Sequence, residues 1–116
     1  MTKFFYLSTC STCQRIIKEL KIEGRVPMQD IKSESMTEDQ IDEMAKMAGS
    51  FEALFSRRAI KYKTLGLKNK ALSEQDIRSL ILEEYTFLKR PVLVLEDQIF
   101  IGNAAKIVSA ANAALA

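Results

Sequence analysis

Hydrophobic residues follow two patterns along this chain: short continuous runs, and runs with the spacing of an amphipathic helix. Residues 3–8 are nearly continuous in apolar side chains, which is typical of a strand covered on both faces. Residues 11–24 follow with a helical pattern, and Gly24 offers a residue at which the helix can end. Its inward face would hold Ile16, Ile17 and Leu20. The pattern predicts a helix that packs on a sheet.

A second strand is predicted over residues 26–31, although Pro27 limits it to a sheet edge or a strand start. Because a helix separates the two strands, we expect them to run parallel in a βαβ unit. A further helix is predicted to begin after Thr37, with Gln40 completing a capping box, and to end at Gly49.

Residues 51–65 are less regular and predict a short helix, with Tyr62 and Leu65 as further inward anchors. Ser73, with Asp76 three residues later, predicts the start of another helix. The middle of the chain is therefore expected to be helical.

Residues 92–95 and 98–101 predict an antiparallel hairpin, and residues 104–116 predict a final helix. Without the helices of about residues 37–85, the order is the minimal thioredoxin fold, β-α-β followed by β-β-α. We predict the α/β class, with a thioredoxin-like (glutaredoxin-like) four-stranded mixed sheet and a helical insertion between strands two and three. At this length a single domain over residues 1–116 is expected.

The amino-acid composition limits the reaction mechanisms and the partners that the chain can have. The chain is 47% hydrophobic and carries 17 basic and 15 acidic residues, a net charge of +2 that favours neither nucleic acid nor membrane as a partner. We expect no direct contact with either. The absence of histidine excludes Ser–His and Cys–His mechanisms and histidine metal sites. With no signal-peptide pattern and no apolar run near the roughly 18 residues that span a bilayer, we expect a cytoplasmic protein.

Cys10 and Cys13 are the two cysteines of the chain, and they lie between the first strand and the first helix. Cys10 should stand at or just before the helix N-terminus, where unpaired N–H groups and the helix dipole favour a thiolate. A thiolate is the reactive form, and a thiol one helical turn away can form a disulfide with it. Two inert core cysteines, or half of a metal site shared with a second chain, are the alternatives. In a cytoplasmic α/β chain, this spacing after a strand favours redox chemistry.

The sequence resembles the arsenate reductase (ArsC) / Spx family of thioredoxin-fold proteins. The resemblance rests on Thr9, Cys10 and Cys13 after the first strand, on residues 51–58, and on Arg90 with Pro91 before the hairpin. It covers essentially the whole chain.

This resemblance implies that Cys10 is the catalytic nucleophile, with Cys13 as a second catalytic thiol. It implies that Arg58 and Arg90 hold an oxyanion against the thiolate, with Arg57 one register away from Arg58. Pro91 would be the cis-proline that faces the cysteine loop. The substrate-binding residues would be Arg58, Arg90, Thr9 and Pro91.

The resemblance also implies that no cofactor is bound and that glutathione with glutaredoxin, or thioredoxin, supplies electrons for a small oxyanion or thiol substrate. The family's arsenate reductases carry a third arginine after the final hairpin, where this chain has Asn103. They do not generally need a cysteine at position 13. The paired cysteines resemble the Spx branch, which implies the alternative of a redox-sensing transcriptional regulator that binds the RNA polymerase α-subunit.

Overall fold

The computed structural model describes all residues 1–116, and its contacts divide the chain into two compact units. The sheet unit comprises Met1–Ser35 and Arg90–Ala116, and the helical unit comprises Met36–Lys89. The helical unit is inserted between the second and third strands, as the sequence predicts. A single domain over the whole chain stays a prediction.

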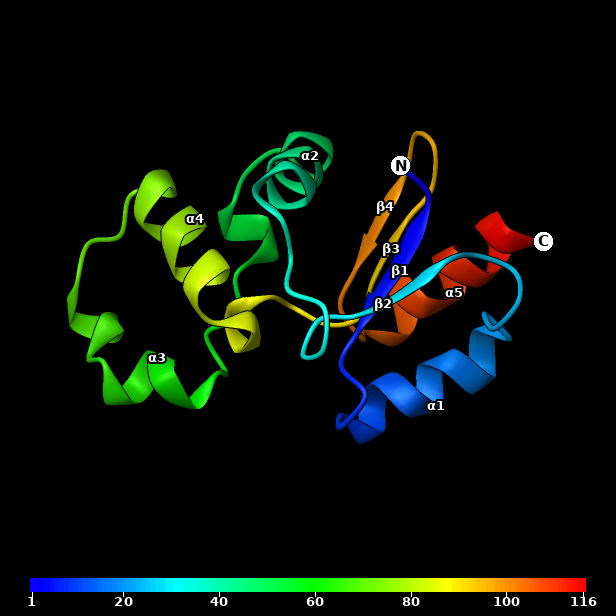
Figure 1. Cartoon of the computed structure of the whole chain (residues 1–116), viewed down its shortest axis with the longest axis horizontal. Helices are drawn as coiled ribbons and strands as arrows, with labels where there is room; N and C mark the ends of the chain where they lie inside the picture. The colour runs from blue at the N-terminus through cyan, green and yellow to red at the C-terminus, as the bar shows by residue number, and fades with distance from the viewer. The chain divides into compact units, whose positions relative to one another are not determined.

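Four strands form the sheet, in the order β2-β1-β3-β4. They are β1 (Lys3–Tyr6), β2 (Met28–Asp30), β3 (Val92–Val94) and β4 (Ile99–Ile101). β1 runs parallel to β2, while β3 runs antiparallel to both β1 and β4. The predicted βαβ unit, hairpin and mixed sheet are therefore confirmed (Figure 1).

One face of this sheet packs against two helices, α1 (Ser11–Leu20) and α5 (Ala105–Leu115), which lie on the same side of it (Figure 1). Alternation along each strand sends every second side chain to that face. In register across the four strands, these side chains are Met28, Phe4, Leu93 and Phe100. Phe4 and Leu93 are fully covered, together with Ile16, Leu20 and Val108 of the helices. This layer fixes the position of α1 on the strand that precedes it.

Helix α1 ends at Leu20, so the predicted end at Gly24 is wrong. Lys21 takes the left-handed conformation (φ 52°), and the Ile22 N–H donates to the Ile17 carbonyl at 3.2 Å. Ile22 is thereby turned into the core, where none of its surface is exposed. Burial of an isoleucine side chain contributes about 1.5–3 kcal/mol, which outweighs the roughly 1–2 kcal/mol cost of a left-handed lysine.

The helical unit contains α2 (Glu38–Ala48), α3 (Ile60–Thr64) and α4 (Glu74–Glu83). Three short 3₁₀ turns connect them: η1 (Glu52–Leu54), η2 (Leu67–Asn69) and η3 (Tyr85–Phe87). Both predicted capping boxes are present, because the Thr37 and Ser73 hydroxyls each accept the N–H three residues on and receive the reciprocal bond. Gly49 ends α2 with a φ of 98°, as expected.

Helices α2 and α4 are joined by buried apolar side chains and by one arginine. Arg78 of α4 donates from Nε to Asp42 Oδ1 at 2.7 Å and from a terminal nitrogen to Glu38 at 3.0 Å. Around them lie the buried side chains Ile41, Met44, Leu54, Phe55, Ile77, Ile81 and Phe87.

Leu65 is not the inward anchor that its spacing suggests, since half of its side chain (50%) is exposed. It follows α3, a helix that buries none of its residues. Tyr62 does pack inward, with its ring 6.0 Å from the Phe55 ring in an edge-on arrangement. A helix of only five residues turns Tyr62 toward the core and leaves its neighbours outside.

None of the helices has both the length and the apolar character needed to cross a bilayer.

Candidate functional site

Cys10 occupies the residue directly before α1, as the sequence predicts. Its backbone is extended (φ −95°, ψ 115°), its N–H donates to the Leu7 carbonyl at 3.0 Å, and its own carbonyl accepts from Gln14 at 3.1 Å. No side chain caps this helix. The first N–H groups of α1 are therefore available to the Cys10 sulfur.

The loop that carries Cys10 is held by two side chains that the sequence analysis did not select. The Asp30 carboxylate accepts the N–H of Ser8 at 3.2 Å, and Gln14 Nε2 donates to the Ser8 carbonyl at 3.0 Å. Hydrogen bonding to Ser8 keeps the pKa of Asp30 below its ordinary value. Asp30 ends β2, and the carboxyl ends of parallel strands meet at one edge of a sheet, so its position in the sequence could have revealed it.

The Cys10 thiol has a lowered pKa. Burial raises the pKa, but the N–H groups of Cys13 and Thr12, the Cys13 thiol and the charge of Arg90 all stabilise the thiolate, and together they outweigh burial. The side chain remains partly open to solvent. Cys10 is thus both the more acidic and the more accessible thiol, which are the two properties of a nucleophilic cysteine.

Cys13 has the opposite character. It is completely buried in the first turn of α1, and burial, helped by the hydrogen bond and negative charge of Cys10, raises its pKa to about 11. It therefore stays protonated at neutral pH and offers its S–H to the Cys10 sulfur. Both cysteines are free thiols in this structure. Two thiols with pKa values displaced in opposite directions can act in sequence, one as the attacking group and the other afterwards.

Arg90 and Pro91 belong to the same unit as the cysteines, directly before β3. The peptide bond between them is cis, as expected. Pro91 is buried, and its carbonyl accepts the N–H of Gly102 at 2.9 Å. Arg90 supplies positive charge to both thiols. The structure therefore brings Cys10, Cys13 and Arg90 into one electrostatic group.

The remaining predicted site residues are Thr9 and Arg58. Thr9 is exposed in the loop before Cys10, and Arg58 is exposed in the helical unit between η1 and α3. Arg57, the neighbour in register, is engaged within its own unit by Glu52 at 2.9 Å and by the face of the Phe55 ring at 5.4 Å. The functions of Thr9 and Arg58 stay predictions.

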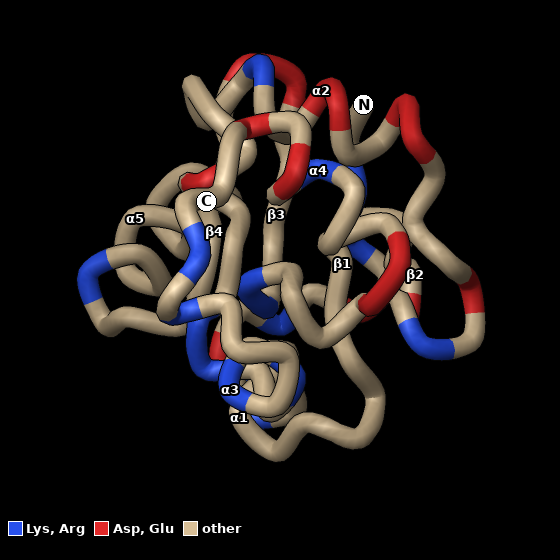
Figure 2. The backbone as a smooth tube through the Cα atoms, turned by 90° about the vertical axis from the view of Figure 1, so that its left-hand side faces the viewer, with Lys and Arg blue, Asp and Glu red and all other residues tan.

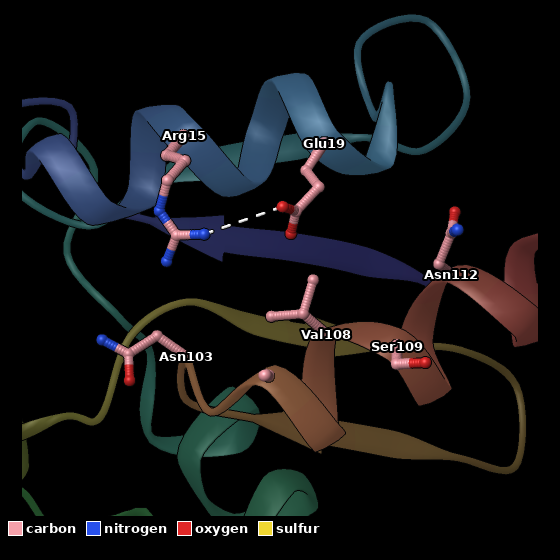
Figure 3. A pocket seen from close by; sticks show the side chains of 7 residues that line it. Arg15, Glu19, Asn103, Val108, Ser109 and Asn112 are labelled. Carbon is pink, nitrogen blue, oxygen red and sulfur yellow. Dashed lines mark ion pairs between the residues drawn. The ribbon is translucent and has the colours of Figure 1, made fainter.

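Arg15 is engaged along α1 by an ion pair with Glu19. Its guanidinium lies 3.7 Å from Glu19 and lines a groove of about 330 Å³ between α1 and α5, where Asn103 and Asn112 also lie (Figure 3). The positive charge that acts on both cysteines is that of Arg90.

No group of three or more histidine, cysteine, aspartate or glutamate side chains is arranged to hold a metal ion.

A mixed four-stranded sheet, a Cys-x-x-Cys pair at the first helix and a cis-proline before β3 define a thioredoxin-like protein with a thiol site. The family model of the ArsC family matches residues 5–111, and the chain belongs to that family.

Individual relatives point to both branches of the family. The global transcriptional regulator Spx of Staphylococcus saprophyticus is 29% identical over 105 residues, covering 88% of this chain and 79% of that protein. A structure described as a possible arsenate reductase from Streptococcus mutans is 27% identical, covering 90% of this chain and 92% of the other, with a TM-score of 0.69. The arsenate reductase of Vibrio cholerae shares the fold, with a TM-score of 0.77 at 18% identity over 94% of this chain and 97% of its own.

We predict that Cys10 is alkylated by iodoacetamide at a lower pH than Cys13, with a midpoint below the ordinary thiol value. Replacing Arg90 by methionine removes a positive charge that stabilises the thiolate, so the pKa of Cys10 should rise and its alkylation at neutral pH should slow severalfold. Peptide mass spectrometry as a function of pH measures both sites separately.

The matched control is Arg15→Met, which removes the same charge from the opposite flank of α1 and should leave the Cys10 midpoint unchanged. Equal midpoints for the two cysteines would contradict the assignment, as would an Arg90→Met profile identical to the parent.

Proposed function

We propose that the protein is a thiol-dependent oxidoreductase of the arsenate reductase type, in which Cys10 attacks a disulfide or an oxyanion. The observation that carries this proposal is the split between the two thiols. Cys10 is partly exposed with a lowered pKa, whereas Cys13 is buried beneath it with a pKa of about 11. Two inert core cysteines would not need pKa values that are displaced in opposite directions.

With a disulfide substrate, the Cys10 thiolate attacks one sulfur and releases the other half of the substrate as a thiolate. A mixed disulfide between Cys10 and the substrate remains. The Cys13 sulfur then attacks Cys10, loses its proton to solvent and releases the second half as a thiolate. The substrate has gained two electrons, and the protein has become a Cys10–Cys13 disulfide.

The timing of Cys13 follows from electrostatics. While Cys10 is a thiolate, its negative charge and its hydrogen bond hold the Cys13 proton in place. Once Cys10 is part of a mixed disulfide, that charge is gone, so the pKa of Cys13 should fall toward the value that burial alone sets. Cys13 thus loses its proton more easily once there is an adduct to resolve, although burial still raises its pKa.

The oxidised pair must be returned to the dithiol by an external thiol. Glutathione with glutaredoxin, or thioredoxin, would do this by the same exchange in reverse order, and no bound cofactor is needed. These donors are reducing systems of the cytoplasm, where we place the protein.

With arsenate, the Cys10 thiolate would displace water from arsenic, and glutathione would then attack Cys10. The electron pair of the sulfur–arsenic bond would remain on arsenic as arsenite. In this scheme Arg90 binds the oxyanion, while Thr9 and Pro91 line the substrate beside Cys10. Arg58 stays the second oxyanion-binding arginine that the family resemblance implies. One feature supports Arg58 over Arg57: both are exposed, but Arg57 is engaged by Glu52 and Phe55. A planar, permanently charged guanidinium suits an oxyanion.

We predict that Cys10→Ser abolishes reduction of hydroxyethyl disulfide in an assay coupled to glutathione and glutaredoxin. Cys13→Ser should instead accumulate a mixed disulfide on Cys10, seen as the added mass of one mercaptoethanol half, while retaining part of the turnover through glutathione. Intact-protein mass spectrometry and the coupled assay measure these two results.

Ser11→Ala, at an exposed neighbouring position, serves as the matched control and should behave as the parent. If Cys10→Ser retained full turnover, or if Cys13→Ser formed no adduct, the proposed roles would be wrong. Activity with arsenate in the same coupled assay would show that the protein also reduces an oxyanion.

A redox-sensing regulator that binds the RNA polymerase α-subunit is the second candidate, favoured by the 29% identity to Spx. For this function, the purified RNA polymerase α-subunit should bind the chain with a Kd that differs between the dithiol and the disulfide form. Titration calorimetry with Cys10→Ser as the form locked in the reduced state measures this difference. Lack of binding in either redox state would exclude this function.

A further inference from the structure

We propose that the segment of residues 57–70 in the helical unit is a docking surface for a protein partner that presents acidic and apolar side chains together. We call residues 57–70 the basic surface. It contains six of the seventeen basic residues of the chain and no acidic residue. They are Arg57, Arg58, Lys61, Lys63, Lys68 and Lys70.

The concentration of charge is local. The other 102 residues carry eleven basic and fifteen acidic residues, so the chain outside the basic surface is net negative. Within the helical unit itself, α2 carries four acidic residues and one lysine, whereas α3 carries two lysines and no acidic residue (Figure 2). Such a separation produces a strong local field although the whole chain has a net charge of only +2.

Most of the carboxylates that face the basic surface are already engaged. Glu52 binds Arg57 at 2.9 Å, Glu84 binds Lys61 at 2.6 Å, and Glu74 accepts the N–H groups of Phe51 and Glu52 at 2.6 and 3.1 Å. Glu83 is exposed and faces the groove beside α3.

The other four basic side chains of the surface are Arg58, Lys63, Lys68 and Lys70, and all four are exposed to solvent. They form no ion pair within the chain. Their charge is therefore available to a partner.

Apolar side chains stand among these charges. Ile60 is 81% exposed and Leu65 is 50% exposed, and they are the two large hydrophobic residues that the fold leaves uncovered. Beside Leu65 lies a groove of about 310 Å³, whose apolar lining is Leu65, Leu80 and Phe87. A groove of this size accepts an apolar side chain, and exposed apolar patches rimmed by charge are typical of interaction surfaces.

The occupant that fits is a protein surface rather than a nucleic acid. Nucleic-acid surfaces combine basic side chains with exposed aromatic rings, but Tyr62, the aromatic residue of the basic surface, is packed against Phe55. A phosphate backbone has nothing to place on Ile60 or in the groove beside Leu65. Acidic side chains that alternate with leucines satisfy both features, since charge complementarity guides association and apolar burial adds affinity.

This surface lies in the helical unit, whereas Cys10 and Cys13 lie in the sheet unit. The inference is separate from the thiol chemistry, because the tested residues Ile60, Lys63 and Lys68 take no part in the proposed cysteine steps. Arg58 is the one residue of the basic surface that the arsenate scheme also names, and the test leaves it unchanged. If the docking proposal fails its test, the proposed thiol chemistry is unaffected, and the reverse also holds.

The test is fluorescence anisotropy of the reduced full chain with a labelled synthetic peptide that alternates glutamate pairs with leucines. A peptide with serine in place of each leucine and a random-sequence DNA duplex are the two comparison probes. We expect the glutamate–leucine peptide to bind more tightly than either, with an affinity that falls as salt is raised.

The double variant Lys63→Glu with Lys68→Glu should weaken peptide binding about tenfold or more, and Ile60→Ser should weaken it severalfold. Lys32→Glu, an exposed lysine of the sheet unit, is the matched control and should bind as the parent does. All these positions are exposed, and circular dichroism confirms that each variant is folded. Equal loss in Lys32→Glu, equal binding of the serine peptide, or tighter binding of DNA would each overturn the proposal.

Discussion

The stabilisation of a thiolate at the N-terminus of α1 is the interaction on which the rest of the site depends. Cys10 precedes the first turn of the helix, so its sulfur receives backbone N–H groups that the helix leaves unpaired. Burial disfavours the negative charge on the Cys10 sulfur and so raises its pKa. The hydrogen-bond donors and the charge of Arg90 together outweigh burial and lower the pKa. Any displacement of the helix relative to β1 would remove this balance.

The sheet supplies the required rigidity. Phe4 of β1 and Ile16 and Leu20 of α1 share one buried layer, which fixes the helix axis. Asp30 at the end of β2 binds the loop between β1 and α1 through Ser8. β3 begins two residues after Arg90, so the antiparallel pairing of β3 with β1 places this charge near the thiols. The chemistry thus follows from three neighbouring strands that end or begin at one edge.

Much of this could be predicted from the sequence, because the signals were local. Three local signals each depend on neighbouring residues: the two strands of the hairpin in residues 92–101, the capping boxes at Thr37 and Ser73, and the strand before Cys10. The opposite pKa displacements could not be predicted in full, since they arise from burial and from Arg90, eighty residues away in sequence from Cys10. Asp30 is a different case: its place at the end of β2 could have revealed it, although its partner Ser8 lies in the loop after β1.

Two expectations failed where tertiary packing overrode a local signal. Gly24 is a good helix end by composition, yet α1 ends at Leu20 because burial of Ile22 outweighs the cost of a left-handed Lys21. Leu65 has the spacing of a core residue, but the short helix before it turns only Tyr62 inward. The exposure of Leu65 and of Ile60 is one of the observations that support the docking surface.

The most direct test of the account is the mass of the intact wild-type chain after brief treatment with a low concentration of hydrogen peroxide. If Cys10 and Cys13 act as a sequential pair, peroxide converts Cys10 to a sulfenic acid, Cys13 condenses with it, and water is released. The chain should then lose the mass of two hydrogen atoms, and dithiothreitol should restore it. An oxygen adduct that persists on Cys10 of the wild type, or two thiols that remain free, would contradict the central claim.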